Sequence, residues 1–72
     1  MIPVWIASQQ EDYESKEILG VFDSYEKAGA CVSKAAEREP GRVEELEEDT
    51  EKGELYFQRG FYSYYVTRWE VQ

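Results

Sequence analysis

The apolar positions near the start of the chain recur with a period of two. Residues 2–7 alternate between aliphatic side chains and a set made of proline, tryptophan and alanine, which predicts a β-strand. Pro3 has no backbone N–H, so it suits the start of a strand or a sheet edge. A second apolar run, residues 18–22, contains Gly20, which permits a bulge or a close approach. Residues 8–16 are polar and predict a loop that joins the two runs as a hairpin.

The next segment carries the signals of a helix start. Either Asp23 or Ser24 can cap the free N–H groups, and with Asp23 as cap Glu26 completes a capping box. We expect residues 39–41, Glu-Pro-Gly, to end the helix because proline and glycine stop helices. A narrow apolar stripe at helical spacing should pack on the strands: Tyr25, Ala28, Val32 and Ala35.

Two further strands are predicted after an acidic segment. Residues 42–53 fit a solvated loop as well as a short helical turn, since Val43 and Leu46 are three positions apart. Residues 55–57 and 61–71 are rich in aromatic side chains and predict strands, with a tight turn at Arg59-Gly60. In the last strand we expect one alternate set to be buried, unless a bulge swaps the faces: Phe61, Tyr65, Trp69 and Val71. The opposite set is Tyr62, Tyr64, Val66 and Arg68.

Together these elements predict one α+β domain over residues 1–72. The expected order is strand, strand, helix, acidic segment, strand, strand, with an antiparallel sheet of three to four strands and one helix packed on one face. The other face of that sheet would be partly bare and aromatic. Of the 72 residues, 42% are hydrophobic and 15% aromatic, which is too rich for a disordered chain.

The distribution of charge narrows the range of functions. The net charge is −8, and residues 37–54 hold nine acidic residues against three basic ones. Residues 11–17 add four acidic residues against Lys16. Such a chain is expected to repel nucleic acid rather than bind it directly, and to attract a protein partner with a basic surface.

The residue types that most often carry catalysis are absent or isolated. The sequence has no histidine, its five glycines are scattered, and Cys31 is the single cysteine. Without a histidine to activate it, Cys31 is better interpreted as a small core side chain than as a reactive thiol. The acidic run lacks the calcium-loop signature, so we interpret its carboxylates as solvated charge. We therefore predict a protein that is not an enzyme and needs no cofactor.

The sequence also contains no apolar run of the length that a membrane helix needs, and its start has no basic segment of the signal-peptide type. These features predict a cytoplasmic protein that does not bind membranes. The aromatic residues of the last strand, interleaved with Arg59 and Arg68, are similar to the stacking surface of a nucleic-acid binder. The negative charge favours a role in the core or in a protein interface instead.

The junction at residues 20–28, Gly-Val-Phe-Asp-Ser-Tyr-Glu-Lys-Ala, carries a family resemblance together with the aromatic ending at residues 64–71. It resembles small uncharacterised proteins of bacteria and their phages, in which a hairpin precedes a helix beginning Val-Phe-x-Ser-x-Glu-Lys-Ala. The resemblance covers about half of the chain and implies this topology but no activity. Residues 42–54 have no counterpart in it.

Small size, segregated negative charge and the phage-like resemblance lead to one functional hypothesis. The chain would be an inhibitor or regulator of the phage anti-defence type, anti-CRISPR proteins included, that imitates nucleic acid and docks on a basic surface of a nucleic-acid-handling complex. The candidate partner-binding residues are Glu11, Asp12, Glu14, Glu44, Glu45, Glu47, Glu48, Asp49, Tyr62, Tyr64 and Arg68.

The alternative hypothesis is a structural or self-associating module. It would pair through residues 61–71, edge to edge or face to face. The expected state of the protein is a monomer or a homodimer.

Overall fold

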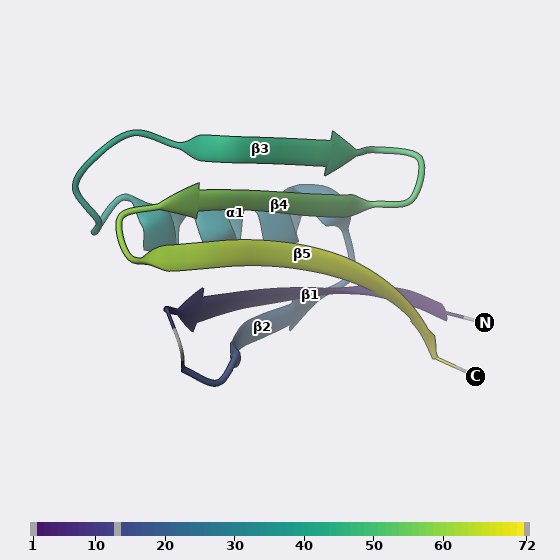
Figure 1. Ribbon diagram of the computed structural model, residues 1–72. Coiled ribbons are helices and arrows are strands. Elements are labelled where there is room, and N and C mark those ends of the chain that lie inside the picture. The colour runs from purple at the N-terminus through teal and green to yellow at the C-terminus, as the bar shows by residue number, and fades with distance from the viewer. Residues whose placement is uncertain (1, 13, 72) are drawn as a thin grey trace.

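The computed structural model describes residues 2–12 and 14–71, which form one helix and five strands (Figure 1). The elements are β1 (Ile2–Glu11), β2 (Glu17–Phe22), α1 (Tyr25–Ala36), β3 (Glu44–Asp49), β4 (Glu54–Arg59) and β5 (Tyr62–Val71). The strands form a single sheet in the order β2-β1-β5-β4-β3, and every neighbouring pair is antiparallel. The α+β class is therefore confirmed, whereas the expected three to four strands and their expected arrangement were wrong.

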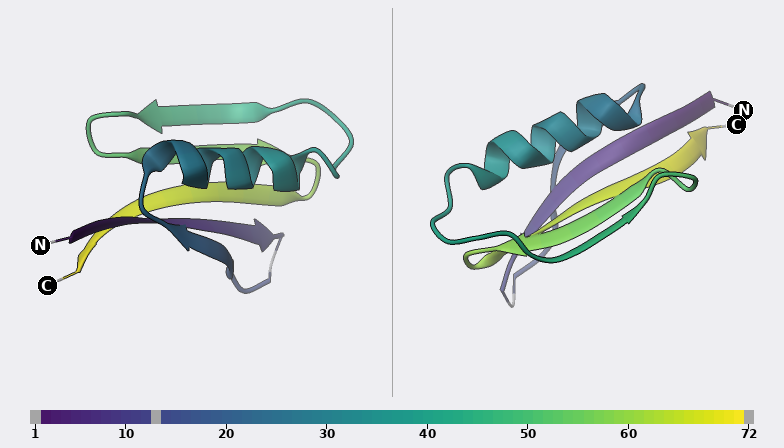
Figure 2. Two further views of the ribbon diagram at one scale, coloured as in Figure 1. Left: turned by 180° about the vertical axis from the view of Figure 1, so that it is seen from behind. Right: turned by 90° about the horizontal axis from the view of Figure 1, so that it is seen from above.

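The helix covers one face of the sheet and leaves the other face open (Figure 2). The molecule is consequently elongated and thin, with principal extents of 38 × 22 × 17 Å. We call the two sides of the sheet the covered face and the open face. Within residues 2–12 and 14–71, no helix is long and apolar enough to cross a membrane.

The core lies between α1 and the covered face, and small side chains dominate it. Because alanines bring the helix axis close to the strands, the larger core residues Phe57 and Tyr64 fill the space beside it, with ring centroids 5.1 Å apart. The buried hydrophobic residues are Ala7, Ala28, Val32, Ala36, Phe57, Tyr64 and Val66.

The start of α1 decides between the two predicted caps. Ser24 is the N-cap, and its Oγ accepts a hydrogen bond from the backbone N–H of Lys27 at 3.2 Å. Asp23 binds the ammonium of Lys27 at 2.9 Å instead of capping the helix. The helix ends at Ala36, before the predicted stop, and the chain then turns at Gly41 with φ of 97°.

The prediction of which face of the last strand is buried was wrong. Tyr64 and Val66 are each 1% exposed, whereas Trp69 is 58% exposed. Both alternate sets of β5 are apolar enough to be buried, so their periodicity does not distinguish them. The register with β1 does, because it places Val66 opposite Ala7, where the helix packs. The covered face therefore takes the proline, tryptophan and alanine set of β1, and the aliphatic set faces outward.

The acidic segment contains a strand, which corrects the loop or helical turn expected for residues 42–53. All six residues of β3 are exposed, so no burial drives the strand. Its order comes from hydrogen-bonded pairing with β4, interrupted by an irregularity between Glu44 and Glu47 where Glu45 has φ of 51°. Acidic side chains along this outer strand also oppose pairing with other chains, which is a common protection of a sheet edge.

Candidate functional site

The open face of the sheet divides into two halves of different chemistry, which we define by the strand register. The acidic–aromatic half lies over β3, β4 and the middle of β5 and consists of Glu47, Asp49, Glu54, Tyr56, Tyr65 and Thr67. The apolar half lies over β2, β1 and the C-terminal end of β5 and consists of Ile2, Val4, Ile6, Ile18, Val21, Trp69 and Val71. We take the acidic–aromatic half as the candidate functional site.

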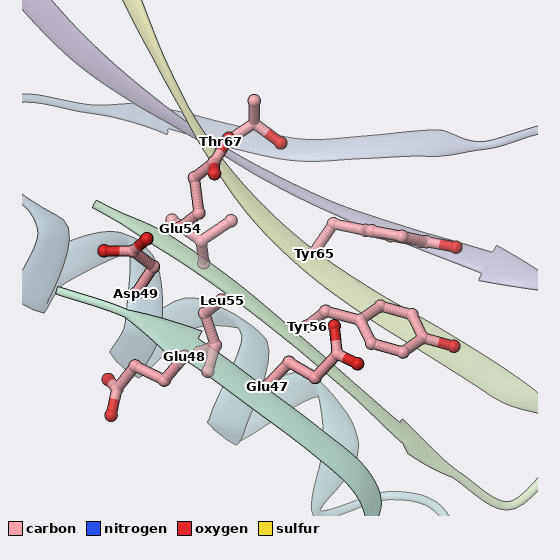
Figure 3. A pocket seen from close by; sticks show the side chains of 9 residues that line it. Glu47, Glu48, Asp49, Glu54, Leu55, Tyr56, Tyr65 and Thr67 are labelled. Atoms are coloured by element: carbon pink, nitrogen blue, oxygen red, sulfur yellow. The ribbon is translucent and has the colours of Figure 1, made fainter. Parts of the chain in front are cut away.

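A shallow hollow of about 300 Å³ occupies the acidic–aromatic half (Figure 3). Tyr56 of β4 and Tyr65 of β5 are cross-strand partners, with ring centroids 5.1 Å apart and planes tilted by 45°. Figure 3 shows the carboxylate of Glu47 beside the ring of Tyr56, with Asp49 and Glu54 further along the strands. Carboxylates and aromatic rings therefore border the same open surface.

The carboxylates of this half have no basic partner among the residues that the structure describes. The described residues form two ion pairs, Lys27–Asp23 and Arg68–Glu70, and neither pair involves a carboxylate of this half. The local field at the hollow is therefore negative and attracts cationic groups.

The ring of Tyr65 already accepts a cation from the protein itself. The ammonium of Lys16, in the loop after β1, lies 3.9 Å from the ring centroid. Gln58 donates a hydrogen bond of 2.6 Å to the hydroxyl of Tyr56 and so orients the neighbouring ring. Lys16 thus already occupies a face of Tyr65, and the ring of Tyr56, which lies beside the carboxylate of Glu47, is suited to contact lysine and arginine side chains of a partner.

The structure places the predicted β3 residues on different sides. Glu47 and Asp49 face the hollow, and Glu44 lies on the same face near the start of β3. Glu48 projects to the covered side, where its carboxylate accepts a hydrogen bond of 2.5 Å from Tyr25. Glu45 lies at the irregularity of the strand.

The residues predicted in the last strand do not face the hollow. Tyr64 is part of the core, which is incompatible with the surface role expected of it. Tyr62 is half-buried on the covered side and donates a long hydrogen bond, 3.4 Å, to Glu11. Arg68 is exposed and pairs with Glu70 at 3.2 Å.

The two acidic segments do not form one continuous surface. Glu11, Asp12 and Glu14 lie at the end of β1 and in the loop that follows it, whereas the other acids belong to the outer strand β3. The strands β5 and β4 separate the two groups in the sheet. A partner that contacts the hollow therefore needs no contact with the β1–β2 loop.

Four residues of the acidic–aromatic half were missing from the candidate list: Glu54, Tyr56, Tyr65 and Thr67. The turn at Gly60, which has φ of 63° and joins β4 to β5, sets which residues of the two strands lie opposite each other. Counting outward from the pair Arg59–Tyr62 places Tyr56 opposite Tyr65 on one face.

The hydrogen bond between Tyr25 and Glu48 attaches the acidic strand to the helix. Burial of the Tyr25 hydroxyl, with the nearby Glu48 carboxylate as a second cause, raises the pKa of Tyr25 above its ordinary value near 10. The hydroxyl therefore stays protonated and can donate to Glu48 at neutral pH. This contact holds β3 beside α1 although all six of its residues are exposed.

Within the described part of the chain, no three metal-ligating side chains gather in one place. No protein-family model matches the chain, and comparisons with curated proteins and with solved structures give no significant match. The features of the chain that point to a function are therefore the geometry and charge of its acidic–aromatic half.

Proposed function

We propose that this protein is a non-enzymatic binding protein whose acidic–aromatic half docks on a basic surface of a partner protein. The observation that carries the proposal is the set of carboxylates at the hollow, which have no basic partner among the described residues and lie beside two half-buried tyrosine rings. The negative field steers a basic partner toward the hollow, and the rings supply flat contact area once it arrives.

The partner class that we propose is a nucleic-acid-handling complex, with the chain acting as an inhibitor of the anti-defence type. The concentration of carboxylates on β3, where five of the six residues are acidic, supports nucleic-acid mimicry. Glu47 and Asp49 project from the same face of the strand toward the hollow, so part of this charge is presented to a partner on one surface, as phosphates are.

The first test measures binding of an arginine-rich peptide by fluorescence anisotropy at low and high salt. Reversing the charge at the hollow with Glu47→Lys, Asp49→Lys and Glu54→Lys should weaken binding by at least about tenfold, because the local field changes sign. The matched control reverses three acids at the end of β1 and in the loop that follows it, Glu11→Lys, Asp12→Lys and Glu14→Lys. Equal losses in both variants would show that net charge alone binds the peptide and would contradict a localised site.

The mimicry is tested separately by competition. An oligonucleotide bound to the same peptide should be displaced by the wild-type protein and not by the hollow variant. A second pair of variants examines the rings: Tyr56→Ala with Tyr65→Ala should weaken peptide binding, whereas Phe61→Ala, a change at an exposed aromatic residue outside the hollow, should not. Retained affinity in the double tyrosine variant would remove the aromatic part of the proposal.

A further inference from the structure

The apolar half of the open face consists largely of side chains that are more than half exposed. Ile2 is 68% exposed, Ile18 64%, Val21 and Trp69 58% each, and Val71 53%. No charged side chain belongs to this half, because Arg68 and Glu70 point to the opposite side of β5. The result is a flat, uncharged apolar surface on the same sheet as the acidic hollow.

The accessible surface area of the molecule is also larger than expected for a monomer of its mass. Its accessible area is 5273 Å². A monomer of 8.5 kDa is expected to expose about 4,650 Å². The thin two-layer shape accounts for this excess of roughly 600 Å², because one side of the sheet has no second layer packed on it.

We propose that the apolar half binds a second copy of this chain, with the two sheets stacked face to face about a twofold axis that runs along β1. In this arrangement β1 faces its own copy, and β2 faces β5 of the partner. Two uncharged halves then cover each other, and each helix lies on the outside. The pairing completes a four-layer sandwich, helix on sheet on sheet on helix.

The distribution of charge favours a second copy in this orientation. Strands are spaced about 4.8 Å apart, so β3 lies about 14 Å to one side of β1, and the two β3 strands of the dimer lie roughly 29 Å apart. Screening in physiological salt acts over about 8 Å. The two acidic–aromatic halves therefore do not repel each other appreciably, and both remain open to a partner.

The area available sets the strength of the contact. The exposed parts of the five most exposed apolar side chains amount to on the order of 400 Å² per copy, and a standard interface buries about 800 Å² per partner. Val4 and Ile6, both half-buried, together with the adjoining backbone, add to this area. We therefore expect a reversible dimer that forms at micromolar or higher concentrations and not a permanent one.

The C-terminal strand is involved through its face and not through its edge. From Tyr62 to Val66, β5 is paired on one side with β1 and on the other with β4, so that part has no edge to offer. The pairing with β4 stops at Val66, and Trp69 and Val71 continue along β1 with their side chains on the open face.

The test is sedimentation equilibrium of the full chain from about 10 μM to about 1 mM, with variants chosen to separate the face from the rest of the surface. Trp69→Asp should raise the dimer dissociation constant by about 30-fold or more, as expected for a large aromatic residue that becomes buried in an interface. The control is Phe61→Asp, which makes a similar change at an aromatic residue that is 72% exposed in the turn between β4 and β5, and it should leave the constant unchanged.

Two further measurements keep the test decisive if Trp69→Asp unfolds the chain. Val21→Asp changes the far side of the same half, on β2, and should also dissociate the dimer. Raising the salt concentration should leave the dimer unchanged or strengthen it, because the contact is apolar and the net charge of each copy is negative. A wild-type chain that stays monomeric at the highest concentration, or equal effects of Trp69→Asp and Phe61→Asp, would overturn the proposal.

Discussion

The covered and open faces of the sheet belong to the same strands but differ in how far their apolar side chains are buried. On β1, the covered face carries Ala7, which is fully buried, and the open face carries Ile2, which is 68% exposed. On β5, Val66 is buried and Trp69 is 58% exposed. The apolar residues directly under the helix are thus small, whereas the larger rings of the covered face, Trp5 and Tyr64, pack beside it. What decides burial here is contact with the helix, and hydrophobicity alone does not.

Contact with the helix explains why Ala7 and Val66 are buried while Ile2 and Trp69 are exposed. Most residues of α1 that face the sheet are small, and it packs mainly on β1, β2 and β5. Small residues on both surfaces let the layers approach closely, so a bulky side chain at Ala7 would hold the helix away from the sheet. Ile2 and Trp69, by contrast, lie on the open face, where no second layer limits the size of a side chain.

The largest effect is expected where the covered face meets the turn between β3 and β4. Gly53 is buried with φ of 70°, and an added Cβ would collide with the indole nitrogen of Trp5. Gly53→Ala should lower the free energy of unfolding by about 2–4 kcal/mol, measured by urea unfolding, because backbone strain and overpacking add. Gly41→Ala is the control, since φ is also positive (97°) but no atom lies within 4 Å of the added Cβ. Equal losses would show that Trp5 does not constrain the turn.

A smaller loss of stability is expected when a valine on the helix is truncated to alanine, and the same truncation on the open face serves as its comparison. Val32→Ala removes two buried methyl groups from the centre of the core and should cost about 1.5–3 kcal/mol of unfolding free energy. Val21→Ala, at a valine that is 58% exposed, should change it by less than about 0.5 kcal/mol. Thermal unfolding at a concentration where the chain is monomeric measures both. A large loss for Val21→Ala under those conditions would mean that the open face is covered within one chain.

The smallest effect concerns the contact that joins β3 to the helix. Tyr25→Phe removes the hydrogen bond to Glu48 and should cost about 1 kcal/mol at pH 7. The raised pKa of Tyr25 also predicts the pH dependence. In the folded state the proton stays on above pH 10, whereas the unfolded chain loses it near pH 10, so the contribution is complete below pH 10 and declines as the pH rises further.

Urea unfolding between pH 7 and pH 11 therefore checks the sign of this effect. The difference in stability between wild type and Tyr25→Phe should be constant up to about pH 10 and then shrink. A difference that grows with pH would show that the hydroxyl is not held protonated by its surroundings. It would also weaken the case that Tyr25 positions the acidic strand.

Local sequence signals determined much of this protein. The serine before the helix, the apolar stripe of α1, the hairpin of β1 and β2, and the glycine turn before β5 all depend on neighbouring residues, so the sequence alone predicted these elements. The concentration of acids and the lack of histidine are likewise properties of the sequence, and they directed attention to binding. The α+β class followed from the order of those elements.

The tertiary structure decided which face the helix covers, that β3 is a strand, and that Tyr56 and Tyr65 meet beside the acids. The physical reason is the same in each case. An alternating strand has two equivalent sides until a distant element packs on one of them. An acidic segment such as β3 has little strand preference until β4 offers its backbone groups. Both choices depend on contacts between residues far apart in the chain, which local periodicity does not encode.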